Sequence, residues 1–474
     1  RTMVHFRRSC RFLRRYEPVL FCAVVVLNLI PILSVKYFPT VDGPAHLYNA
    51  KLIIELLSGG SSWNDFIGFN GSFTPNWTGH LLLSLLLKLF SPSIAEKVIL
   101  GIYLVGVPLL VRQLLSQLRA PSLVLVYLVF PFLYSYLFHF GFFNYHLAIV
   151  FFFAGLIVWV RALNSTSNRI WILAGLMAFL IALSHPFVFG LYLVLSLVMT
   201  IGIKMDSDPS LLRVFLRQLV VLSPGIITTS FFLLSSDSIN QSTSRIPWDD
   251  LLISFKYIMP IKGLNVELYH IPSKVLLYLF SGLVIVALTG IVIPSVKPRI
   301  SLYTWVGVTV LTSLLVFIFP DYLGDAGLIS SRLMWFSFIF LIIALALVDF
   351  PRIIRYMVLF VALSLTVWSI NHNFTQIKPA SDLAAEIVEL SESIEPGSTV
   401  LSITNFGNRQ FSRVGHYAGL QNDILFLRNY EAELSYFPLV WNYEGLPKFR
   451  LGLVGPTDCA GWVEGARETR TIDY

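Results

Sequence analysis

Charged side chains are scarce in this chain: they make up 13% of its 474 residues, whereas 56% of the residues are hydrophobic. Soluble globular domains carry about 25% charged residues. The lower density cannot cover the surface of a soluble protein of this length, so the composition predicts a polytopic membrane protein. It excludes an intrinsically disordered chain, a collagen and a coiled coil. A porin-like barrel is also disfavoured, because the apolar stretches are near-continuous and do not alternate with polar residues.

Cysteine is rare as well, with three residues in the whole chain. Cys10 lies in a basic tail, Cys22 in the first apolar run and Cys459 near the C-terminus. This spacing matches neither a disulfide framework nor a metal-binding cluster. The sequence also has no visible internal repeat, which weighs against a transporter built from two related halves.

The net charge of +7 is concentrated near the N-terminus, where several arginines precede the first apolar run. Residues 1–17 are therefore interpreted as a cytoplasmic basic tail and not as a nucleic-acid-binding segment. No convincing cleavage site follows, so we expect a membrane anchor instead of a signal peptide. The last residues, TRTIDY, resemble an interrupted strand, so truncation at one or both ends stays open.

Eleven apolar runs are candidates for crossing the bilayer, which requires about 20 residues each. The apolar stretch 78–91 is too short, and if it crossed, every later loop would change sides and the positive-inside rule would fail. We therefore expect it to re-enter the membrane or lie in the interface, with the N-terminus cytoplasmic and the C-terminus outside. The predicted spans are 18–36, 94–115, 120–138, 145–160, 170–184, 186–203, 212–235, 273–294, 300–319, 331–349 and 353–370.

The C-terminal segment, 371–474, differs in character from the predicted transmembrane region, 18–370. Residues 382–394 have helical spacing, a Glu-Pro-Gly sequence ends that pattern, and 398–403 is typical of a buried strand. A small external α/β domain is therefore predicted. The expected fold class is an all-α polytopic membrane protein of about eleven transmembrane helices, with a long first external loop at 36–93 and this C-terminal domain.

The first external loop opens with FPTVDGPAHLYNA and leads into an amphipathic helix ending near Leu57. Asp42, followed by Pro44, is typical of a helix N-cap. His46 lies four residues further on, where its side chain can approach Asp42. Two interpretations stay open: Asp42 only caps the helix while His46 lies at headgroup level, or Asp42 is a general base oriented by His46.

A cytoplasmic N-terminus, one span and a long external loop opening with an aspartate resemble the GT-C superfamily of membrane glycosyltransferases, of the protein mannosyltransferase or aminoarabinose transferase type. In those enzymes the loop continues as a membrane-parallel helix and then an apolar helix containing Pro and His, here PNWTGHLLL with His80. The resemblance implies a polyprenyl-phosphate sugar donor and Asp42 as the catalytic residue. The chain has DGPAH where protein mannosyltransferases carry an acidic pair, and it lacks the Trp-Trp-Asp motif of oligosaccharyltransferases, so the sugar and the acceptor stay open.

Polar residues at the predicted outer ends of other spans are candidates for substrate binding. Arg332 suits a departing phosphate, with an interface anchor as the alternative. Asp321 and Asp325 could hold sugar hydroxyls or a metal, or simply be solvated. The segment HFGFFNYH and a Ser-His-Pro sequence could stack on a sugar and bond its hydroxyls, or belong to an aromatic belt. The candidates in these two sequences are His139, Asn144, His146 and His185.

No histidine spacing such as His-Glu-x-x-His occurs, so we expect no metal site formed by histidines. A divalent cation, Mg²⁺ or Mn²⁺, held by carboxylates stays open, because some members of the superfamily use one.

The leading hypothesis is an inverting glycosyltransferase that moves a sugar from a polyprenyl-phosphate donor to a glycan, lipid or protein acceptor on the outer side, in a bacterial inner membrane. One alternative is a transporter or flippase, which would need ionisable residues at mid-membrane depth. Another is a catalytically silent assembly partner with the same architecture.

Overall fold

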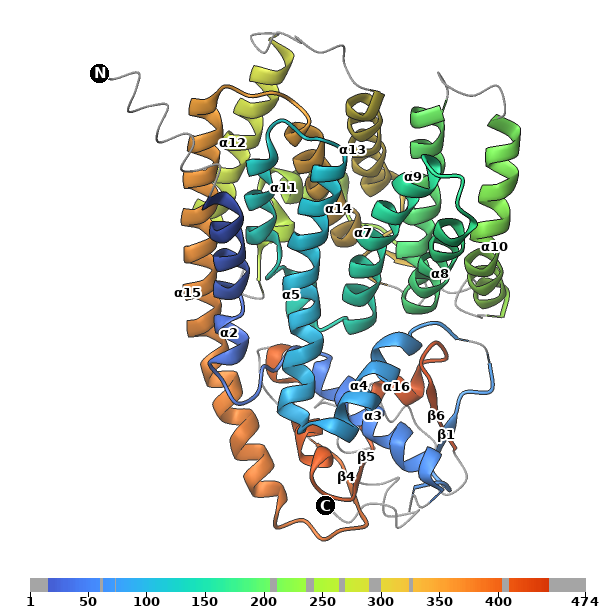
Figure 1. Ribbon diagram of the computed structural model, residues 1–474. Helices are drawn as coiled ribbons and strands as arrows, with labels where there is room; N and C mark the ends of the chain where they lie inside the picture. Colours follow the sequence, from blue (N-terminus) through green and yellow to red (C-terminus); the bar gives the residue numbers. More distant parts are fainter. Residues whose placement is uncertain are drawn as a thin grey trace.

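The computed structural model describes residues 16–59, 63–72, 74–204, 211–235, 243–263, 269–289, 300–323, 327–402 and 409–442. The chain is mostly helical, and its long helices lie side by side in a bundle above a smaller layer (Figure 1). Among the described residues, seven helices are long and apolar enough to cross a bilayer, in agreement with a multi-pass membrane protein. They are Tyr16–Leu33, Pro92–Gln117 (α5), Phe143–Leu163 (α7), Leu212–Leu234 within α10 (Leu211–Ser235), His270–Leu288 (α12), Ile329–Ala346 (α14) and Arg352–Ser391 (α15).

The other four predicted spans coincide with shorter helices, so the total of eleven spans stays a prediction. One of them, η1 (Leu123–Phe132), is a 3₁₀-helix that contacts α5, α14 and α15. Because such a helix rises about 2 Å per residue, it covers roughly 20 Å of a hydrocarbon core about 30 Å thick. The other three are α8 (Asn168–Ser184), the part Pro186–Gly202 of α9 (Pro186–Lys204) and the part Leu302–Ile318 of α13 (Ile300–Ile318).

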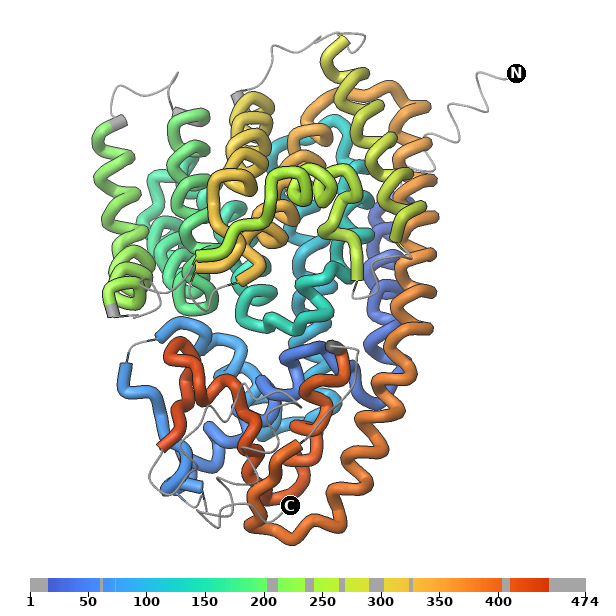
Figure 2. The backbone as a smooth tube through the Cα atoms, turned by 180° about the vertical axis from the view of Figure 1, so that it is seen from behind, coloured from blue at the N-terminus to red at the C-terminus, as the bar shows by residue number. Residues whose placement is uncertain are grey.

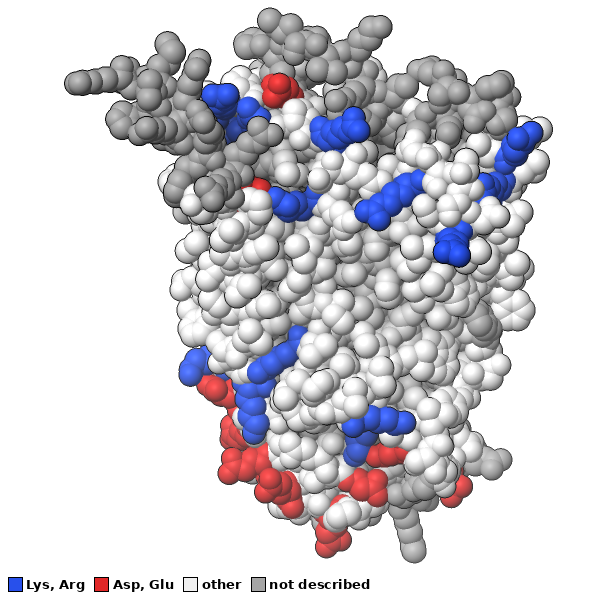
Figure 3. Space-filling model, viewed as in Figure 1, with Lys and Arg blue, Asp and Glu red and all other residues white. Residues whose placement is uncertain are grey.

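The surface of the bundle carries a band without charged side chains. Figure 3 shows lysines and arginines above and below this band, whereas acidic side chains gather at the lower end. Large apolar side chains of the spanning helices are exposed, including Leu234, Leu288 and Phe360, which are 87%, 80% and 72% exposed. Apolar side chains facing outward from a helix bundle indicate a bilayer environment.

Below the bundle, two segments that are far apart in the sequence form one layer (Figures 1 and 2); it is called the outer layer here because the sequence predicts both segments on the outer side. Strand β1 (Ile67–Phe69) of the first loop pairs antiparallel with β6 (Leu439–Trp441) of the C-terminal segment. Strands β4 (Ser398–Val400) and β5 (Ile424–Phe426) form a parallel pair. The helices of this layer are α3 (Gly43–Ser58), α4 (Trp77–Leu89), η5 (Arg409–Phe411), η6 (Val414–Leu420) and α16 (Tyr430–Glu433).

The described part of the C-terminal segment therefore packs against the first loop, and a separate external domain at 371–474 stays a prediction. The strand predicted at 398–403 is present as β4 and is buried. The helix predicted at 382–394 is the end of α15, which is continuous from the last span into the outer layer. A helix of 40 residues is about 60 Å long, twice the hydrocarbon thickness, so it extends well beyond the bilayer.

Short elements complete the fold. They connect the spanning helices or lie beside them, and one further two-stranded sheet joins β2 and β3. These elements are α6 (Tyr136–Phe140), β2 (Thr243–Ser244), α11 (Trp248–Lys256), η3 (Met259–Ile261) and β3 (Tyr322–Leu323), and α2 (Ile30–Leu33) is the end of the first spanning helix.

Helix α3 begins directly after Asp42, as the sequence predicts. The capping interpretation of Asp42 is nevertheless wrong, because its side chain makes no capping hydrogen bond. The backbone N–H of Gly43 donates instead to Oγ1 of Thr40, at 3.0 Å. The helix ends at Gly59, whose positive φ of 71° suits a residue without a Cβ atom. The carboxylate of Asp42 is therefore available for other partners.

Candidate functional site

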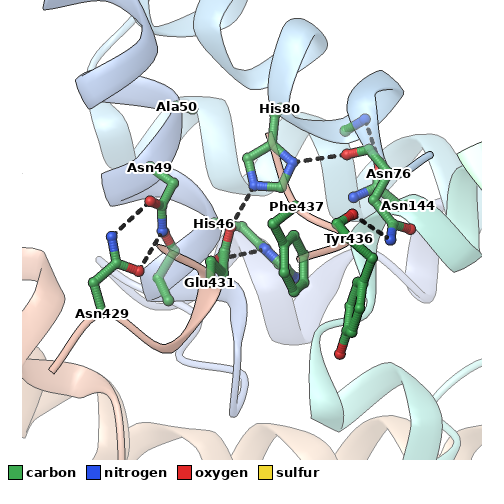
Figure 4. Close-up of polar contacts among 12 residues, drawn as sticks. His46, Asn49, Ala50, Asn76, His80, Asn144, Asn429, Glu431, Tyr436 and Phe437 are labelled. Carbon is green, nitrogen blue, oxygen red and sulfur yellow. Dashed lines mark hydrogen bonds and ion pairs between the residues drawn. The ribbon is translucent and has the colours of Figure 1, made fainter. Parts of the chain in front are cut away.

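Three buried side chains from three helices of the outer layer converge on one point (Figure 4). His46 of α3 places Nδ1 at 2.8 Å from Oε1 of Glu431, which lies on α16. His80 of α4 places Nε2 at 2.6 Å from Oε2 of the same carboxylate. The three residues are 3%, 1% and 1% exposed, in the order His46, His80, Glu431. One carboxylate is thus shared between two imidazoles in a site that water barely reaches.

The surrounding groups orient these three side chains. Nδ1 of His80 lies 2.9 Å from the backbone oxygen of Asn76, and since a carbonyl only accepts, Nδ1 carries the hydrogen and donates it. The amides of Asn49 and Asn429 hydrogen-bond each other in both directions, at 2.9 and 2.7 Å, and join α3 to the segment before α16 (Figure 4). Phe437 packs against both imidazole rings, with centroid distances of 6.0 and 5.9 Å.

Asp42 lies one turn before His46 on α3 and is also buried, at 7% exposed. Its Oδ1 is 2.8 Å from Nε of Arg413, whose guanidinium carbon lies 3.5 Å from the ring centroid of Tyr430. His46 lies near enough to Asp42 for their charges to interact, as expected, but each forms its ion pair with another residue: Arg413 for Asp42 and Glu431 for His46. Asp42, His46, His80, Arg413 and Glu431 are called the carboxylate cluster below.

Burial and charge act in opposite directions on the groups of this cluster. Burial raises the pKa of Asp42 above its ordinary value, and the charge of Arg413 opposes the shift without cancelling it. Burial alone would also raise the pKa of Glu431, but His46 and His80 outweigh burial and hold that pKa well below its usual range. For His46, burial disfavours the charged ring, yet Glu431 outweighs it and raises the pKa. Glu431 is therefore an anion in the folded protein.

A second group of polar side chains lies at the outer end of α14. Arg332, 7% exposed, places Nη1 at 3.2 Å from Nε2 of His185. Its guanidinium carbon lies 5.0 and 5.2 Å from the ring centroids of Phe142 and Tyr145. A guanidinium can only donate, so Nε2 of His185 accepts and this imidazole is neutral. We call these four residues the arginine site.

The guanidinium of Arg332 lacks an anionic partner in the part of the chain that the structure describes. No carboxylate there forms an ion pair with it, and its Nε has no hydrogen-bond partner among the same residues. A buried cation without an anion is costly unless something compensates for it.

The first turn of α7 connects the two groups. Phe142 and Tyr145 face Arg332, whereas Phe143 packs on His46 with ring centroids 5.3 Å apart. The carboxylate cluster and the arginine site thus lie on either side of one turn of helix, where the bundle meets the outer layer.

Other residues predicted for the site have partners in the protein fold. Oδ1 of Asn144 accepts a hydrogen bond from the backbone N–H of Gly79 at 2.6 Å and holds the start of α4. His139 and His146 are buried, and the ring of His146 lies 4.5 Å from that of Tyr103. The ring of His139 stacks on that of Phe38, with centroids 6.4 Å apart, whereas neither ring nitrogen of His146 has a hydrogen-bond partner among the described residues.

Of the two acidic candidates before α14, the structure describes Asp321 but not Asp325. Oδ1 of Asp321 accepts a hydrogen bond from the backbone N–H of Ser330 at 2.9 Å, in the first turn of α14. This contact satisfies one of the free backbone donors at a helix start. Asp325 lies outside the described residues.

Sequence reasoning missed Glu431 and Arg413, the two members of the cluster that the C-terminal segment supplies. Glu431 lies 351 residues from His80 along the chain, and no spacing pattern connects residues so far apart. The available signal was compositional: acids and arginines in a segment predicted to share the outer side with His46 and His80. The set of two histidines and one glutamate also differs from the expectation of no histidine metal site, because its ligand-type atoms lie within 4.8 Å of one another.

No protein-family model and no curated protein sequence matches the chain. The function is therefore argued from the geometry of the site.

Proposed function

We propose that the protein is a membrane glycosyltransferase that moves a sugar from a polyprenyl-phosphate donor to an acceptor on the outer side of the membrane. The observation that carries this proposal is the buried guanidinium of Arg332, which lacks a carboxylate partner among the described residues. A phosphate would supply the missing negative charge, and a guanidinium matches its oxygens in a bidentate manner. Because Arg332 lies in the first turn of a spanning helix, that phosphate would sit at headgroup depth, where a lipid phosphate lies.

Asp42 is proposed as the general base. Its pKa is raised by burial, which makes the carboxylate a stronger proton acceptor than an exposed aspartate. In the proposed step the acceptor oxygen attacks the anomeric carbon and loses its proton to Asp42, while the bond from that carbon to the phosphate oxygen breaks. The electron pair leaves with the lipid phosphate, whose charge Arg332 stabilises. A single displacement of this kind inverts the anomeric configuration.

The alternative of a transporter requires ionisable side chains along a path through the bilayer. Among the described spanning helices, the buried charged side chains are Glu96, in the first turns of α5, and Arg332. Glu96 accepts hydrogen bonds from the backbone N–H of Phe38 and from the hydroxyl of Tyr417, at 2.9 and 2.5 Å, so it faces the outer layer. This one-sided distribution supports a reaction site at the membrane surface over a transport path.

The proposal is tested with the purified full chain in lipid nanodiscs, supplied with a panel of radiolabelled polyprenyl-phosphate hexoses and pentoses and with a membrane extract as acceptor source. Arg332→Gln should reduce transfer by about 10²–10³-fold, because one group that stabilises the leaving charge is lost. Arg332→Lys should retain more activity. The matched control is Arg161→Gln, which changes an exposed arginine at the other end of α7.

Equal transfer by wild type and Arg332→Gln would refute the role of Arg332. If wild type transfers no sugar from any donor but moves a fluorescent lipid-phosphate sugar across proteoliposomes, the transporter is the better assignment.

A further inference from the structure

His46, His80 and Glu431 have the composition of a metal-binding site. Two imidazole nitrogens and a carboxylate are a frequent ligand set of divalent transition metals, and in zinc enzymes two histidines and one glutamate leave a fourth position open. The three side chains come from α3, α4 and α16, and all are nearly inaccessible to solvent. Their ligand-type atoms lie within 4.8 Å of one another.

We propose that these three residues bind one divalent transition-metal ion of the zinc class, through Nδ1 of His46, Nε2 of His80 and the carboxylate of Glu431. The proposal is independent of the proposed transferase activity, since it concerns only what holds the outer layer together. Such an ion would tie α3 and α4 of the first loop to α16 of the C-terminal segment, one turn from Asp42.

The hydrogen bond of His80 to Asn76 supports this assignment. Histidines that bind metals usually donate their other ring N–H to a carbonyl or carboxylate, which fixes the tautomer and the ring orientation. His80 donates Nδ1–H to the backbone oxygen of Asn76, so Nε2 is the nitrogen left to face Glu431, and an ion bound there would take the place of the hydrogen between them. Figure 4 shows the two contacts on opposite sides of the same ring.

The geometry at His46 supports it as well. Nδ1 of His46 and Oε1 of Glu431 are 2.8 Å apart, yet they are not aligned as a hydrogen bond, and neither atom has another hydrogen-bond partner among the described residues. In a tetrahedral site the nitrogen lone pair points at the ion, which lies to one side of the line from nitrogen to oxygen. An ion about 2.0–2.1 Å from each ligand atom separates those atoms by roughly 3.3 Å. The present nitrogen–oxygen distances need to widen by about half an ångström, which small side-chain rotations can achieve.

The fold around the three ligands is also pre-organised. The reciprocal amide pair of Asn49 and Asn429 fixes α3 against the segment that leads into α16. Phe437 packs on both imidazole rings and excludes water from that side. A site whose ligands are held before the ion arrives binds it more tightly.

The test measures metal content and needs no turnover, so its failure is distinct from failure of the proposed activity. The purified full chain in nanodiscs is stripped with a chelator, reloaded with Zn²⁺ or Co²⁺, and analysed by plasma mass spectrometry and by Co²⁺ absorption. Wild type should hold about one ion per chain, and Glu431→Gln and His80→Gln should each lower affinity at least tenfold. His270→Gln and Glu389→Gln are matched controls, because both change exposed side chains.

A cysteine variant separates the loss of a metal ligand from a loss of the fold. His80→Cys keeps a zinc ligand, so it should retain Zn²⁺ and should add a thiolate-to-metal charge-transfer band to the Co²⁺ spectrum, which only direct coordination produces. The proposal is overturned if folded wild type binds neither ion stoichiometrically. It is also overturned if folded His80→Gln binds as tightly as wild type, or if Co²⁺-loaded His80→Cys lacks the band.

Discussion

Two sets of buried ionisable groups lie where the helix bundle meets the outer layer, and they are compensated in opposite ways. In the carboxylate cluster, Asp42 pairs with Arg413, and Glu431 pairs with two histidines. In the arginine site, Arg332 contacts a neutral imidazole and two aromatic rings; Asp321 is near enough for its charge to interact with the guanidinium, but no described carboxylate forms an ion pair with it. Charges that are paired within the protein contribute to holding it together, whereas an unpaired buried cation calls for an anionic ligand. Removing Arg413, which leaves the buried carboxylate of Asp42 unpaired, should therefore harm folding, and removing Arg332 should harm function alone.

The largest expected effect is on transfer by Asp42→Asn. This change leaves the shape of the side chain intact and removes the proton acceptor, so sugar transfer should fall by about 10²–10⁴-fold. Transfer from the radiolabelled donor identified with wild type provides the measurement. Asp65→Asn, which alters an exposed acid of the same loop, should behave as wild type. Undiminished transfer by Asp42→Asn would show that the carboxylate of Asp42 has a structural role only. The carboxylate cluster would then contribute no catalytic residue.

The next largest effect is expected on the free energy of unfolding when the ion pair of the carboxylate cluster is broken. Arg413→Gln leaves the buried carboxylate of Asp42 without its ion pair, and we expect a loss of about 3 kcal/mol in the free energy of unfolding. The double variant Asp42→Asn/Arg413→Gln has no charge left to compensate and should regain most of that loss. Thermal unfolding in nanodiscs, followed by size-exclusion chromatography, measures both. If the double variant is as unstable as Arg413→Gln, the loss arises from the stacking of Arg413 on Tyr430 and not from the charge.

Much of the helical framework could be predicted from the sequence, because apolar runs and helix starts are local features. The start of α3 after Asp42, the helix at the end of α15 and strand β4 all follow from patterns within a dozen residues. The sequence also marked His46, His80, His185 and Arg332 as candidates, since polar residues are conspicuous at the ends of apolar runs.

The partners of those residues could not be predicted in the same way. The pairing of His46 and His80 with Glu431, and of Asp42 with Arg413, depends on the C-terminal segment folding against the first loop. That contact joins residues more than 300 positions apart, and local periodicity carries no information about it. The capping interpretation of Asp42 failed for a related reason, because the nearer Thr40 satisfies the backbone donor of Gly43.

A smaller effect is expected in the pH dependence of transfer. A general base must be ionised, so activity is lost as pH falls through the pKa of Asp42, and burial raises that pKa above the ordinary value of about 3.9. The acidic limb of the rate profile should therefore lie above that value. Arg413 lowers the pKa of Asp42, so Arg413→Lys should leave the limb in place and Arg413→Gln should move it to higher pH. An unchanged limb in Arg413→Gln would assign the limb to a different group.

The smallest expected effect distinguishes the arginine site most clearly from the carboxylate cluster. Arg332→Gln should change the free energy of unfolding by less than about 1 kcal/mol. Among the described residues, no carboxylate forms an ion pair with Arg332 and would be left unpaired, and its neutral replacement avoids the cost of burying a cation, which offsets the lost contacts with Phe142 and Tyr145. The same variant should show the large loss of sugar transfer described above, so it should affect transfer strongly and the free energy of unfolding only slightly. A destabilisation of 3 kcal/mol or more, comparable to that of Arg413→Gln, would mean that Arg332 is compensated from within the chain. The arginine site would then be a second structural ion pair, and the observation that carries the proposal of a lipid-phosphate donor would be lost.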